Sequence, residues 1–334
     1  MVRLIDIARA ANVSRAVVSA VLSTRTGGTI RVAPATVKKI RRIASKLNYV
    51  PNVSARILNG KSSGSIGVLL DSCAPGVSVR MLRAIEHEAS EHNFRTLVAE
   101  SHDSAENLYE NYMILCQYGV DGVICLSHDY PGQNDKVNEL FAGAEKIVFV
   151  RGPAVPGQPL VKLDIAGGMN RAVEHLYSVG KEKLMLVVQN TGSWGFRSRM
   201  TGFQQAAAGG QGVICSLPPS GQEPLPEEID TICRKIETEK IDGVIARNDF
   251  DALALISALQ KRQIRVPEDV AVIGNDNEPF GKFSPVTLTT IDYNLPEIAR
   301  FALAMLQKTD DPVQELTVSP ELIIRNSTTG GNCQ

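Results

Sequence analysis

Apolar residues at the start of the chain recur at the spacing of an amphipathic helix. Leu4, Ile7, Ala8 and Ala11 stand at positions i, i+3, i+4 and i+7, so they line one face of a short helix. Asn12 interrupts the pattern, and asparagine tolerates the left-handed backbone of a tight turn. The pattern therefore predicts a short helix that ends in a turn.

A second short helix is predicted directly after this turn, with Ser14 as its N-cap. Its buried side is predicted to carry Val17, Val18, Val21 and Leu22. Its outer face near the start carries Arg15, Ala16, Ser19 and Ala20. Two short helices joined by a tight turn form a helix-turn-helix, which places the first turn of its second helix in the major groove of DNA. On this stretch alone, a helical hairpin within an enzyme is an equal alternative.

A third helix and a further helical segment follow. Pro34 suits the first position of the third helix. Its apolar stripe is predicted to comprise Val37, Ile40, Ala44 and Leu47. Three short helices of this kind close a small core. The segment Asn52–Asn59 can also form a helix that ends at Gly60, but its eight residues are too few for a stable isolated helix.

Basic charge is concentrated at the N-terminal end of the chain. Residues 1–61 contain twelve Lys and Arg residues and one acidic residue, Asp6, which gives a formal charge of +11. The whole chain carries −1, so the remaining residues carry −12. A small basic head on an acidic body is the electrostatic footprint of a protein that binds a phosphate backbone.

From Ser65 onward, short apolar runs alternate with amphipathic helical runs. The runs predicted to be strands are 65–70, 95–99, 122–126, 146–150, 160–163, 183–188, 243–246 and 270–274. Alternating strands and helices imply parallel sheets with helices on both faces. The predicted fold is therefore a small all-α helix-turn-helix head plus an α/β body of two doubly wound parallel-sheet lobes.

Three motifs connect this chain to a known family. The segments LIDIARAANVSRAVVSAVLS, LNYVPNVSARILNGKS and SIGVLL, in this order, resemble the lactose/galactose repressor (LacI/GalR) family of bacterial transcription regulators, and the resemblance covers essentially the whole chain. It implies the fold of periplasmic sugar-binding proteins for the body, with the chain crossing between lobes three times.

The resemblance also implies a division of the chain. A helix-turn-helix domain is expected at 1–50, a hinge at 51–61, and an effector-binding and dimerisation domain at 62–330. The N-lobe of the last domain is expected at about 62–160 plus 292–318, and the C-lobe at about 161–291 plus 319–328.

In this family the segment matching Asn52–Asn59 is a hinge helix that orders on operator DNA when two subunits pair. A leucine then wedges into the minor groove at the operator centre. The matching residue is Leu58, with Ala55 on the same face, and Asn52 is a further expected DNA contact. An apolar side chain at this place levers a base step apart and kinks the duplex. The alternative is that Leu58 is a linker residue packed on the body.

Three features near the helices and the C-terminus qualify the resemblance. The loop Ser23–Ala33 is longer than its counterpart in the lactose repressor by about four residues, so its DNA contacts stay open. Ala33 stands where a capping serine is usual. The chain ends soon after the strand-like ELIIRNS without a heptad tail, so no tetramer-forming coiled coil is expected.

Polar residues follow several predicted strands, where ligands bind in open parallel sheets. Those at strand ends are Asp71, Arg151, Asn248 and Asp276. Arg199 lies in the segment Trp194–Phe203, also just after a strand. Guanidinium and carboxylate groups suit bidentate hydrogen bonds to vicinal hydroxyls or to an anionic group.

The resemblance assigns roles to these positions. It gives sugar- or nucleobase-contacting roles to Arg199, Asn248 and Asp276, and further pocket positions to Asp71, Arg151 and Tyr293. Trp194 offers a stacking face for a sugar or a base. Structural alternatives remain: Asp276 caps the following loop or pairs with Arg199, Asp249 caps its helix, and Trp194 packs against a lobe.

Other classes of protein find little support. The five histidines form no H-E-x-x-H motif and lie near no G-x-S-x-G elbow, and no glycine-rich phosphate loop with lysine is present, so neither an enzyme nor a cofactor is expected. The six cysteines form no C-x-x-C pair, so no metal site is expected and they are interpreted as reduced cytoplasmic thiols. No apolar run is long enough to cross a membrane, and the absent signal segment argues against an exported binding protein.

The sequence therefore predicts a cytoplasmic, nucleoid-associated homodimer that regulates transcription, most simply as a repressor. Two heads would bind a near-palindromic double-stranded DNA operator. A small polar effector, a carbohydrate or a similar molecule, would bind between the lobes and change operator affinity.

Overall fold

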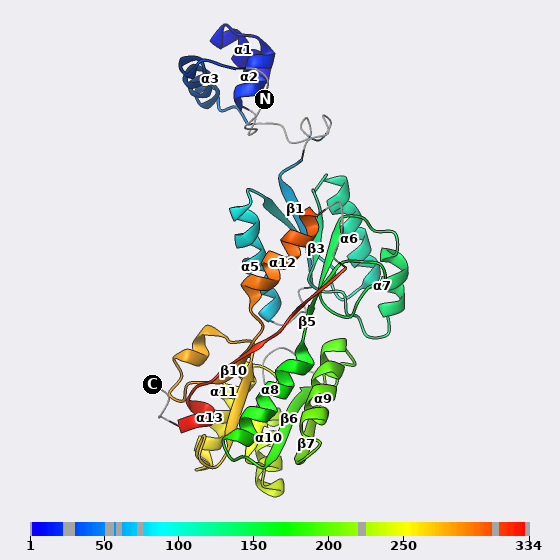
Figure 1. The fold of residues 1–334 in the computed structure, drawn as a ribbon, viewed down its shortest axis with the longest axis vertical. Coiled ribbons are helices and arrows are strands. Elements are labelled where there is room, and N and C mark those ends of the chain that lie inside the picture. Colours follow the sequence, from blue (N-terminus) through cyan, green and yellow to red (C-terminus); the bar gives the residue numbers. More distant parts are fainter. Residues whose placement is uncertain are drawn as a thin grey trace. The chain divides into compact units, whose positions relative to one another are not determined.

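The computed structural model describes residues 2–22, 31–50, 57, 62–71, 76–219, 225–308 and 314–330. The chain divides into two compact units, Met1–Ser63 and Gly64–Gln334 (Figure 1). The described part of the first unit contains helices and no strand, and the second unit contains two largely parallel sheets covered by helices.

The head has the three predicted helices: α1 (Leu4–Ala11), α2 (Arg15–Leu22) and α3 (Pro34–Lys46). Asn12 has φ 55° and ψ 50°, so it makes the left-handed turn after α1. The seven buried apolar side chains of this core are Ile7, Ala8, Ala11, Val18, Val21, Ile40 and Ala44. The apolar stripes of three short helices thus close one small core.

One detail of α3 differs from the prediction and another agrees with it. Leu47 is 36% exposed, so its assignment to the buried stripe was wrong; the partly buried Ile43 packs on the core instead. Leu47 is the C-cap of α3, one residue beyond the last residue of the helix, Lys46. Ala33 is the N-cap and makes no side-chain capping bond, as its methyl group dictates.

Some predictions for this region fall on residues that the structure does not describe. The loop at 23–30 is one such segment, and the predicted hinge at 51–61 is described only at Ile57. The predicted DNA contacts Asn52, Ala55 and Leu58 therefore lie outside the described residues.

The body contains two six-stranded sheets. The first comprises β1 (Ser65–Leu70), β2 (Arg95–Glu100), β3 (Val123–Cys125), β4 (Ile147–Arg151), β5 (Leu160–Leu163) and β11 (Glu315–Val318). The second comprises β6 (Lys183–Gln189), β7 (Gln211–Leu217), β8 (Gly243–Ile245), β9 (Ala271–Asn275), β10 (Thr289–Asp292) and β12 (Glu321–Ile323). The fold class predicted from the sequence is confirmed.

The two sheets share one strand order. The orders are β2-β1-β3-β4-β5-β11 and β7-β6-β8-β9-β10-β12, and the neighbouring strands are parallel except for the antiparallel pair β10–β12. In each sheet the order reverses beside the first strand, which is the topological switch point where doubly wound sheets bind ligands. Strands β7, β10 and β11 were not predicted from the sequence.

Helices cover both faces of each sheet, as Figure 1 shows. Those of the first lobe are α5 (Gly76–Glu91), α6 (Ala105–Gln117), α7 (Asn134–Phe141) and α12 (Leu295–Gln307). Those of the second are α8 (Ile165–Ser178), α9 (Trp194–Ala206), α10 (Pro226–Glu239), α11 (Asp249–Lys261), the 3-10 turn η1 (Pro279–Lys282) and α13 (Asn326–Thr329). Successive strand residues point to opposite faces: Val68 packs with α5 and α12, whereas Leu69 packs with α6 and α7.

The chain passes between the sheets three times. It leaves the first sheet after β5, returns after β10 to form α12 and β11, and leaves again to form β12. The strands of both sheets direct their carboxyl ends toward the region between the lobes, which places polar strand-end residues of both lobes near one another.

Candidate functional site

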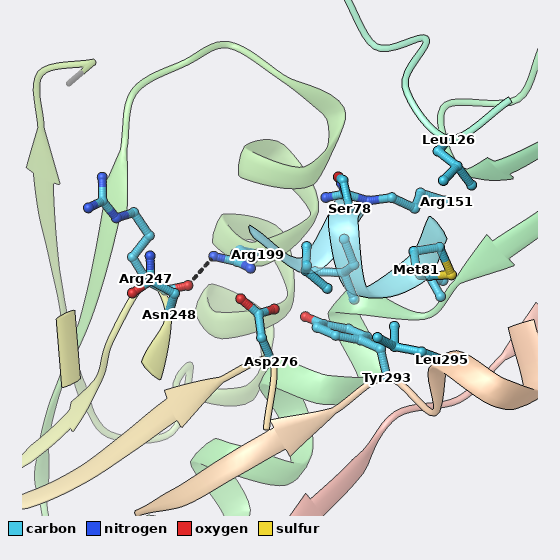
Figure 2. A pocket seen from close by; sticks show the side chains of 13 residues that line it. Ser78, Met81, Leu126, Arg151, Arg199, Arg247, Asn248, Asp276, Tyr293 and Leu295 are labelled. Carbon is cyan, nitrogen blue, oxygen red and sulfur yellow. Dashed lines mark hydrogen bonds between the residues drawn. The ribbon is translucent and has the colours of Figure 1, made fainter. Parts of the chain in front are cut away.

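A cavity of about 80 Å³ lies between the carboxyl ends of the two sheets (Figure 2). Side chains of both lobes line it: Val77, Ser78, Met81, Leu126, Arg151, Leu163, Ile165, Arg199, Arg247, Asn248, Asp276, Tyr293 and Leu295. Five of the seven predicted effector contacts are therefore brought together in one cavity: Arg151, Arg199, Asn248, Asp276 and Tyr293.

Two of these residues stand at strand ends in unusual backbone conformations. Arg151 ends β4 with φ 89°, and Asp276 follows β9 with φ 103°. Residues other than glycine rarely adopt such angles, and they persist only where the surroundings hold them. Around Asp276, Arg80 donates to the main-chain oxygen at 2.6 Å, and the Asp276 amide donates to the oxygen of Ile291 at 2.9 Å.

The Asp276 carboxylate is fixed from its own side of the cavity. Asn275 Nδ2 donates to Asp276 Oδ1 at 3.1 Å, and the Tyr293 hydroxyl donates to Asn275 Oδ1 at 3.0 Å. Burial raises the pKa of Asp276, while Arg199, Arg151 and Arg80 oppose that rise. Among the described residues no ion pair within 4.0 Å joins Asp276 to Arg199, so the alternative of a closed structural pair is not what the structure shows.

Arg199 and Arg247 come from α9 and from the end of β8. Arg199 Nη1 donates to the main-chain oxygen of Arg247 at 2.7 Å, the bond drawn in Figure 2. The Arg247 guanidinium points away from Arg199 and pairs with Asp251, with Nε 2.7 Å from Oδ2. Burial raises the pKa of Asp251, and Arg247 opposes that rise. The Arg247 charge is thus neutralised outside the cavity, whereas its carbonyl positions Arg199.

Asn248 lines the cavity and also begins helix α11. Its Oδ1 accepts from the Asp251 amide at 2.8 Å, so Asn248 is the N-cap and its side-chain nitrogen is left to donate. The sequence interpretation that Asp249 caps this helix was wrong. Asp249 is fully buried and accepts from the Thr290 hydroxyl and the Glu278 amide, both at 2.6 Å, and burial raises its pKa to about 7.

Two predicted effector contacts are not among the cavity-lining residues. Asp71 is buried in the first lobe, where it accepts from Ser101 Oγ at 3.2 Å and from the Asp103 amide at 2.8 Å. Trp194 packs over the backbone of Gly152: a Cβ at Gly152 would lie 2.9 Å from the indole. Asp71 thus makes hydrogen bonds within the first lobe and Trp194 packs against Gly152, and neither lines the cavity.

Two contacts join the lobes beside this cavity. Arg80 of α5 reaches the second lobe, where it pairs with Glu278 at 3.2 Å in addition to its bond to the Asp276 oxygen. Asp129, in the loop after β3, accepts from the Trp194 amide at 2.5 Å, at the first residue of α9. A carboxylate is stabilised there by the positive end of the helix dipole. Both contacts favour closed lobes.

Sequence reasoning missed several lining residues. Ser78 and Met81 lie on α5, in one of the runs that the sequence analysis interprets only as amphipathic helix. Arg247 directly precedes Asn248, but strand ends alone do not show which neighbour's backbone faces the cavity. Ser78 is 3% exposed, and its hydroxyl has no hydrogen-bond partner within the described part of the chain.

The predicted DNA-contacting residues of the head lie at and after the start of α2. Ser14, Arg15 and Ala16 are exposed, whereas Ser19 and Ala20 are partly buried. Ser14 Oγ accepts from the Val17 amide at 3.3 Å, so the predicted N-cap forms. An exposed arginine therefore stands in the first turn of the second helix, as base readout by a helix-turn-helix requires.

The described residues contain no helix long and apolar enough to cross a membrane. Within the same residues, no group of three or more His, Cys, Asp or Glu side chains is placed to hold a metal ion.

Comparisons with known proteins agree with this architecture. Residues 3–52 match the model for bacterial regulatory proteins of the lacI family, and residues 173–328 match the model for a periplasmic binding protein-like domain. The chain is 27% identical to the HTH-type transcriptional regulator DegA of Bacillus subtilis (strain 168), over 97% of each chain. It is 25% identical to the HTH-type transcriptional repressor PurR of Haemophilus influenzae (strain PittEE), over 96% of this chain and 97% of that one.

Solved structures share the fold at lower identity. The crystal structure of the lac repressor dimer bound to operator and the anti-inducer ONPF matches with a TM-score of 0.82 and 22% identity, over 98% of this chain and 99% of that chain. The complex of the transcriptional regulator CelR with cellobiose matches with a TM-score of 0.63 and 22% identity, over 98% and 100% of the two chains.

A helix-turn-helix head and a two-lobed body with a cavity between its sheets define a DNA-binding, effector-binding transcription regulator. Residues 3–52 match the lacI family of bacterial regulatory proteins, and relatives that are 25–27% identical to this chain over nearly its whole length are transcription regulators. The resemblance found in the sequence is confirmed, and the relatives named above are transcription regulators and not enzymes.

Proposed function

We propose that this protein is an operator-binding repressor whose DNA affinity is set by a small polar effector. Residues 1–50 would bind DNA, 51–61 would form the hinge, and 62–330 would bind the effector and form the dimer. The observation that carries the proposal is the exposed first turn of α2, with Arg15 and Ala16 at the surface of a strongly basic unit.

Base recognition is assigned to this turn. Arginine is the best bidentate reader of guanine in the major groove, and Ser14 and Ala16 flank Arg15 at the surface. Ser19 and Ala20, which are partly buried, would approach the groove with their exposed atoms.

Selection of operators from random double-stranded DNA with the purified protein tests this proposal. A near-palindromic site is expected, and Arg15→Ala should lose about 1–3 kcal/mol per half-site and relax preference at one base pair. Arg41→Ala, which removes an exposed charge from α3, is the matched control and should weaken all sequences alike. Unchanged preference at every position in Arg15→Ala would remove this residue from base readout.

The hinge proposal rests on the sequence and on the family. Asn52, Ala55 and Leu58 would contact the minor groove when two hinges order together on operator DNA. Eight residues are not helical alone, so ordering is expected only on DNA. Hydrogen exchange over residues 52–59 with and without operator measures it, and equal protection in both states would contradict it.

The effector is proposed to bind in the cavity between the lobes, in contact with Arg151, Arg199, Asn248, Asp276 and Tyr293. Asp71 and Trp194 are left as indirect contributors, because neither lines the cavity. A solved member with this fold binds cellobiose and another binds operator DNA together with ONPF, which supports a carbohydrate-like effector here. The effector would act by binding open and closed lobes with different affinity.

A homodimer is proposed on the basis of exposed apolar side chains on both lobes. Val79 on α5 and Val98 on the edge strand β2 are 54% and 47% exposed. On the second lobe, Phe250 and Phe283 are 52% and 85% exposed. Large exposed apolar groups of this kind mark interaction surfaces, and a two-fold operator requires a second copy of this chain. A repressor of chromosomal genes would work in the bacterial cytoplasm, at the nucleoid.

A further inference from the structure

We propose that the effector carries an anionic group, a phosphate or a carboxylate, and that Arg151 and Arg199 bind this group from the two lobes. The inference rests on the effector site proposed above and names the chemical class that the site selects. It is carried by the balance of charge on the cavity wall.

The cavity wall has more positive than negative charge. Three arginines and one aspartate line it: Arg151, Arg199, Arg247 and Asp276. Arg247 is neutralised by Asp251, with Nε 2.7 Å from Oδ2 and side chains only 10% and 3% exposed. Among the residues that line the cavity, Arg151 and Arg199 therefore face a single carboxylate, Asp276, so the lining carries one positive charge in excess; Asp129, which also raises the pKa of Arg151, does not line the cavity.

The two guanidinium groups are also left without a direct carboxylate partner. In the described part of the chain, no carboxylate oxygen lies within 4.0 Å of the Arg151 or Arg199 guanidinium, and Arg151 makes no hydrogen bond to another described residue. Burial lowers the pKa of Arg151, which is the signature of a charge withdrawn from water without full compensation. A neutral ligand cannot supply the missing charge, whereas a phosphate or carboxylate forms short, bidentate bonds to arginine.

Hydrogen bonds from its neighbours hold Asp276, which does not pair directly with Arg151 or Arg199. The Asp276 backbone is held by Arg80 and its carboxylate accepts from Asn275, and it makes no ion pair within 4.0 Å with either the Arg151 or the Arg199 guanidinium. Figure 2 shows Arg199 extending into the space above Asp276 and Tyr293, with Arg151 entering from the other lobe. The structure thus separates the charges as a binding site does, instead of pairing them as a structural ion pair does.

The remaining wall defines the rest of the ligand. The Ser78 hydroxyl is 3% exposed and without a partner among the described residues, so it offers a donor to an anionic oxygen. Asp276 and the Asn248 side chain suit hydroxyl groups, and Met81, Leu126 and Leu295 form an apolar wall for carbon atoms. These features fit a small hydroxylated anion, such as a sugar phosphate or a sugar acid.

The probes for this proposal are sodium phosphate and sodium malonate, which carry the two anionic groups in question. Sodium chloride at equal ionic strength is the reference, and mannitol is the neutral hydroxylated probe. We expect phosphate or malonate at about 10 mM to raise the thermal unfolding midpoint of the full chain by about 3 °C over chloride, the shift that a Kd near ~1 mM produces in a domain of this size. Comparing the two anions distinguishes the phosphate source from the carboxylate source.

Arg151→Gln should abolish this shift, and without any anion it should unfold at a higher temperature than the wild type, because it removes a partly buried guanidinium that has no carboxylate within 4.0 Å among the described residues. Arg199→Gln tests the same response independently, should Arg151→Gln not fold. Arg234→Gln is the matched control: this arginine is 66% exposed on α10, and the anion shift should be retained.

Three outcomes would overturn the inference. The first is that phosphate and malonate change the unfolding midpoint no more than chloride does. The second is that the anion shift persists in Arg151→Gln and Arg199→Gln. The third is that mannitol raises the midpoint of the wild type more than either anion does. Operator selection with the same wild-type preparation separates this result from the proposed function. Absence of specific DNA binding would refute the repressor proposal, whereas the anion-binding proposal is decided by the unfolding midpoints alone.

Discussion

His128 is a buried imidazole in the first lobe, near the cavity between the lobes, and its environment makes stability depend on pH. It follows β3, is 2% exposed and packs against the Phe149 ring with centroids 4.8 Å apart. Nε2 lies 2.7 Å from the oxygen of Pro153, which only accepts, so Nε2 carries the proton and donates. Nδ1 has no partner in the described part of the chain, so a second proton would bring an unpaired charge into the core.

Burial lowers the pKa of His128 from 6.5 to about 4, with the Pro153 bond and Asp129 opposing the change and Arg151 adding to it. The unfolded chain therefore binds a proton on His128 at a higher pH than the folded chain does. Stability is fully present above pH 6.5 and is lost as the pH falls toward 4. Between about pH 7.5 and about pH 5, this one group should cost about 2 kcal/mol of unfolding free energy.

Urea unfolding at both pH values measures this loss. His128→Gln keeps a donor for the Pro153 oxygen but does not titrate, so it should lose about 2 kcal/mol less than the wild type on acidification. His92→Gln is the control for loss of a surface histidine: the His92 side chain is 48% exposed, and its Nε2 lies 3.3 Å from Glu88 Oε1. If the wild type and His128→Gln lose the same free energy between the two pH values, the assignment of the acid sensitivity to His128 is wrong.

Three further predictions concern the cavity, the contacts between lobes and the dimer. Asp276→Ala should abolish the effect of the effector on operator affinity, and unchanged ligand affinity by titration calorimetry would show that the carboxylate is not a ligand contact. Asp129→Asn keeps an acceptor for the Trp194 amide but removes the charge of the carboxylate. It should lower the free energy of unfolding in urea by about 1 kcal/mol and increase the radius of gyration in small-angle X-ray scattering. An unchanged radius would contradict the inference that this contact holds the lobes closed. Phe283→Glu should shift sedimentation from dimer toward monomer, unlike Lys282→Glu at its exposed neighbour, and equal behaviour of the two variants would exclude Phe283 from the dimer contact.

Strands with strong apolar patterns were predictable from the sequence, and the others were not, for identifiable reasons. Strand β10 contains Thr289 and Thr290, which are fully buried but polar. Their hydroxyls donate to the oxygen of Arg325 at 2.9 Å and to Asp249 at 2.6 Å, so partners distant in sequence make this strand compatible with the core. Strand β7 lies at a sheet edge and begins with two exposed residues, so its pattern is weak.

The candidate site was predictable as far as strand ends determine it. Arg151 and Asp276 follow apolar strands, and parallel topology brings such positions together. Asp71 also follows a strand, but its carboxylate is used by Ser101 and by the Asp103 amide. Ser78 lies on a helix face with no polar pattern to distinguish it, and only the packing of α5 against the cavity shows its position. The partners of a side chain and the face that a helix turns toward a cavity depend on tertiary packing, which cannot be predicted from one sequence.

The threefold crossing of the chain has a consequence for how the body is made on the ribosome. Helix α12 packs on the first sheet through Ile298 and Ala302, and β11 pairs with β5, yet both are synthesised after β10 of the second sheet. The first lobe of a nascent chain must therefore wait, with the apolar face around Val68 uncovered, until almost the whole protein has emerged. Neither lobe is a separable N-terminal folding unit, and a truncation before β11 and β12 damages both lobes at once.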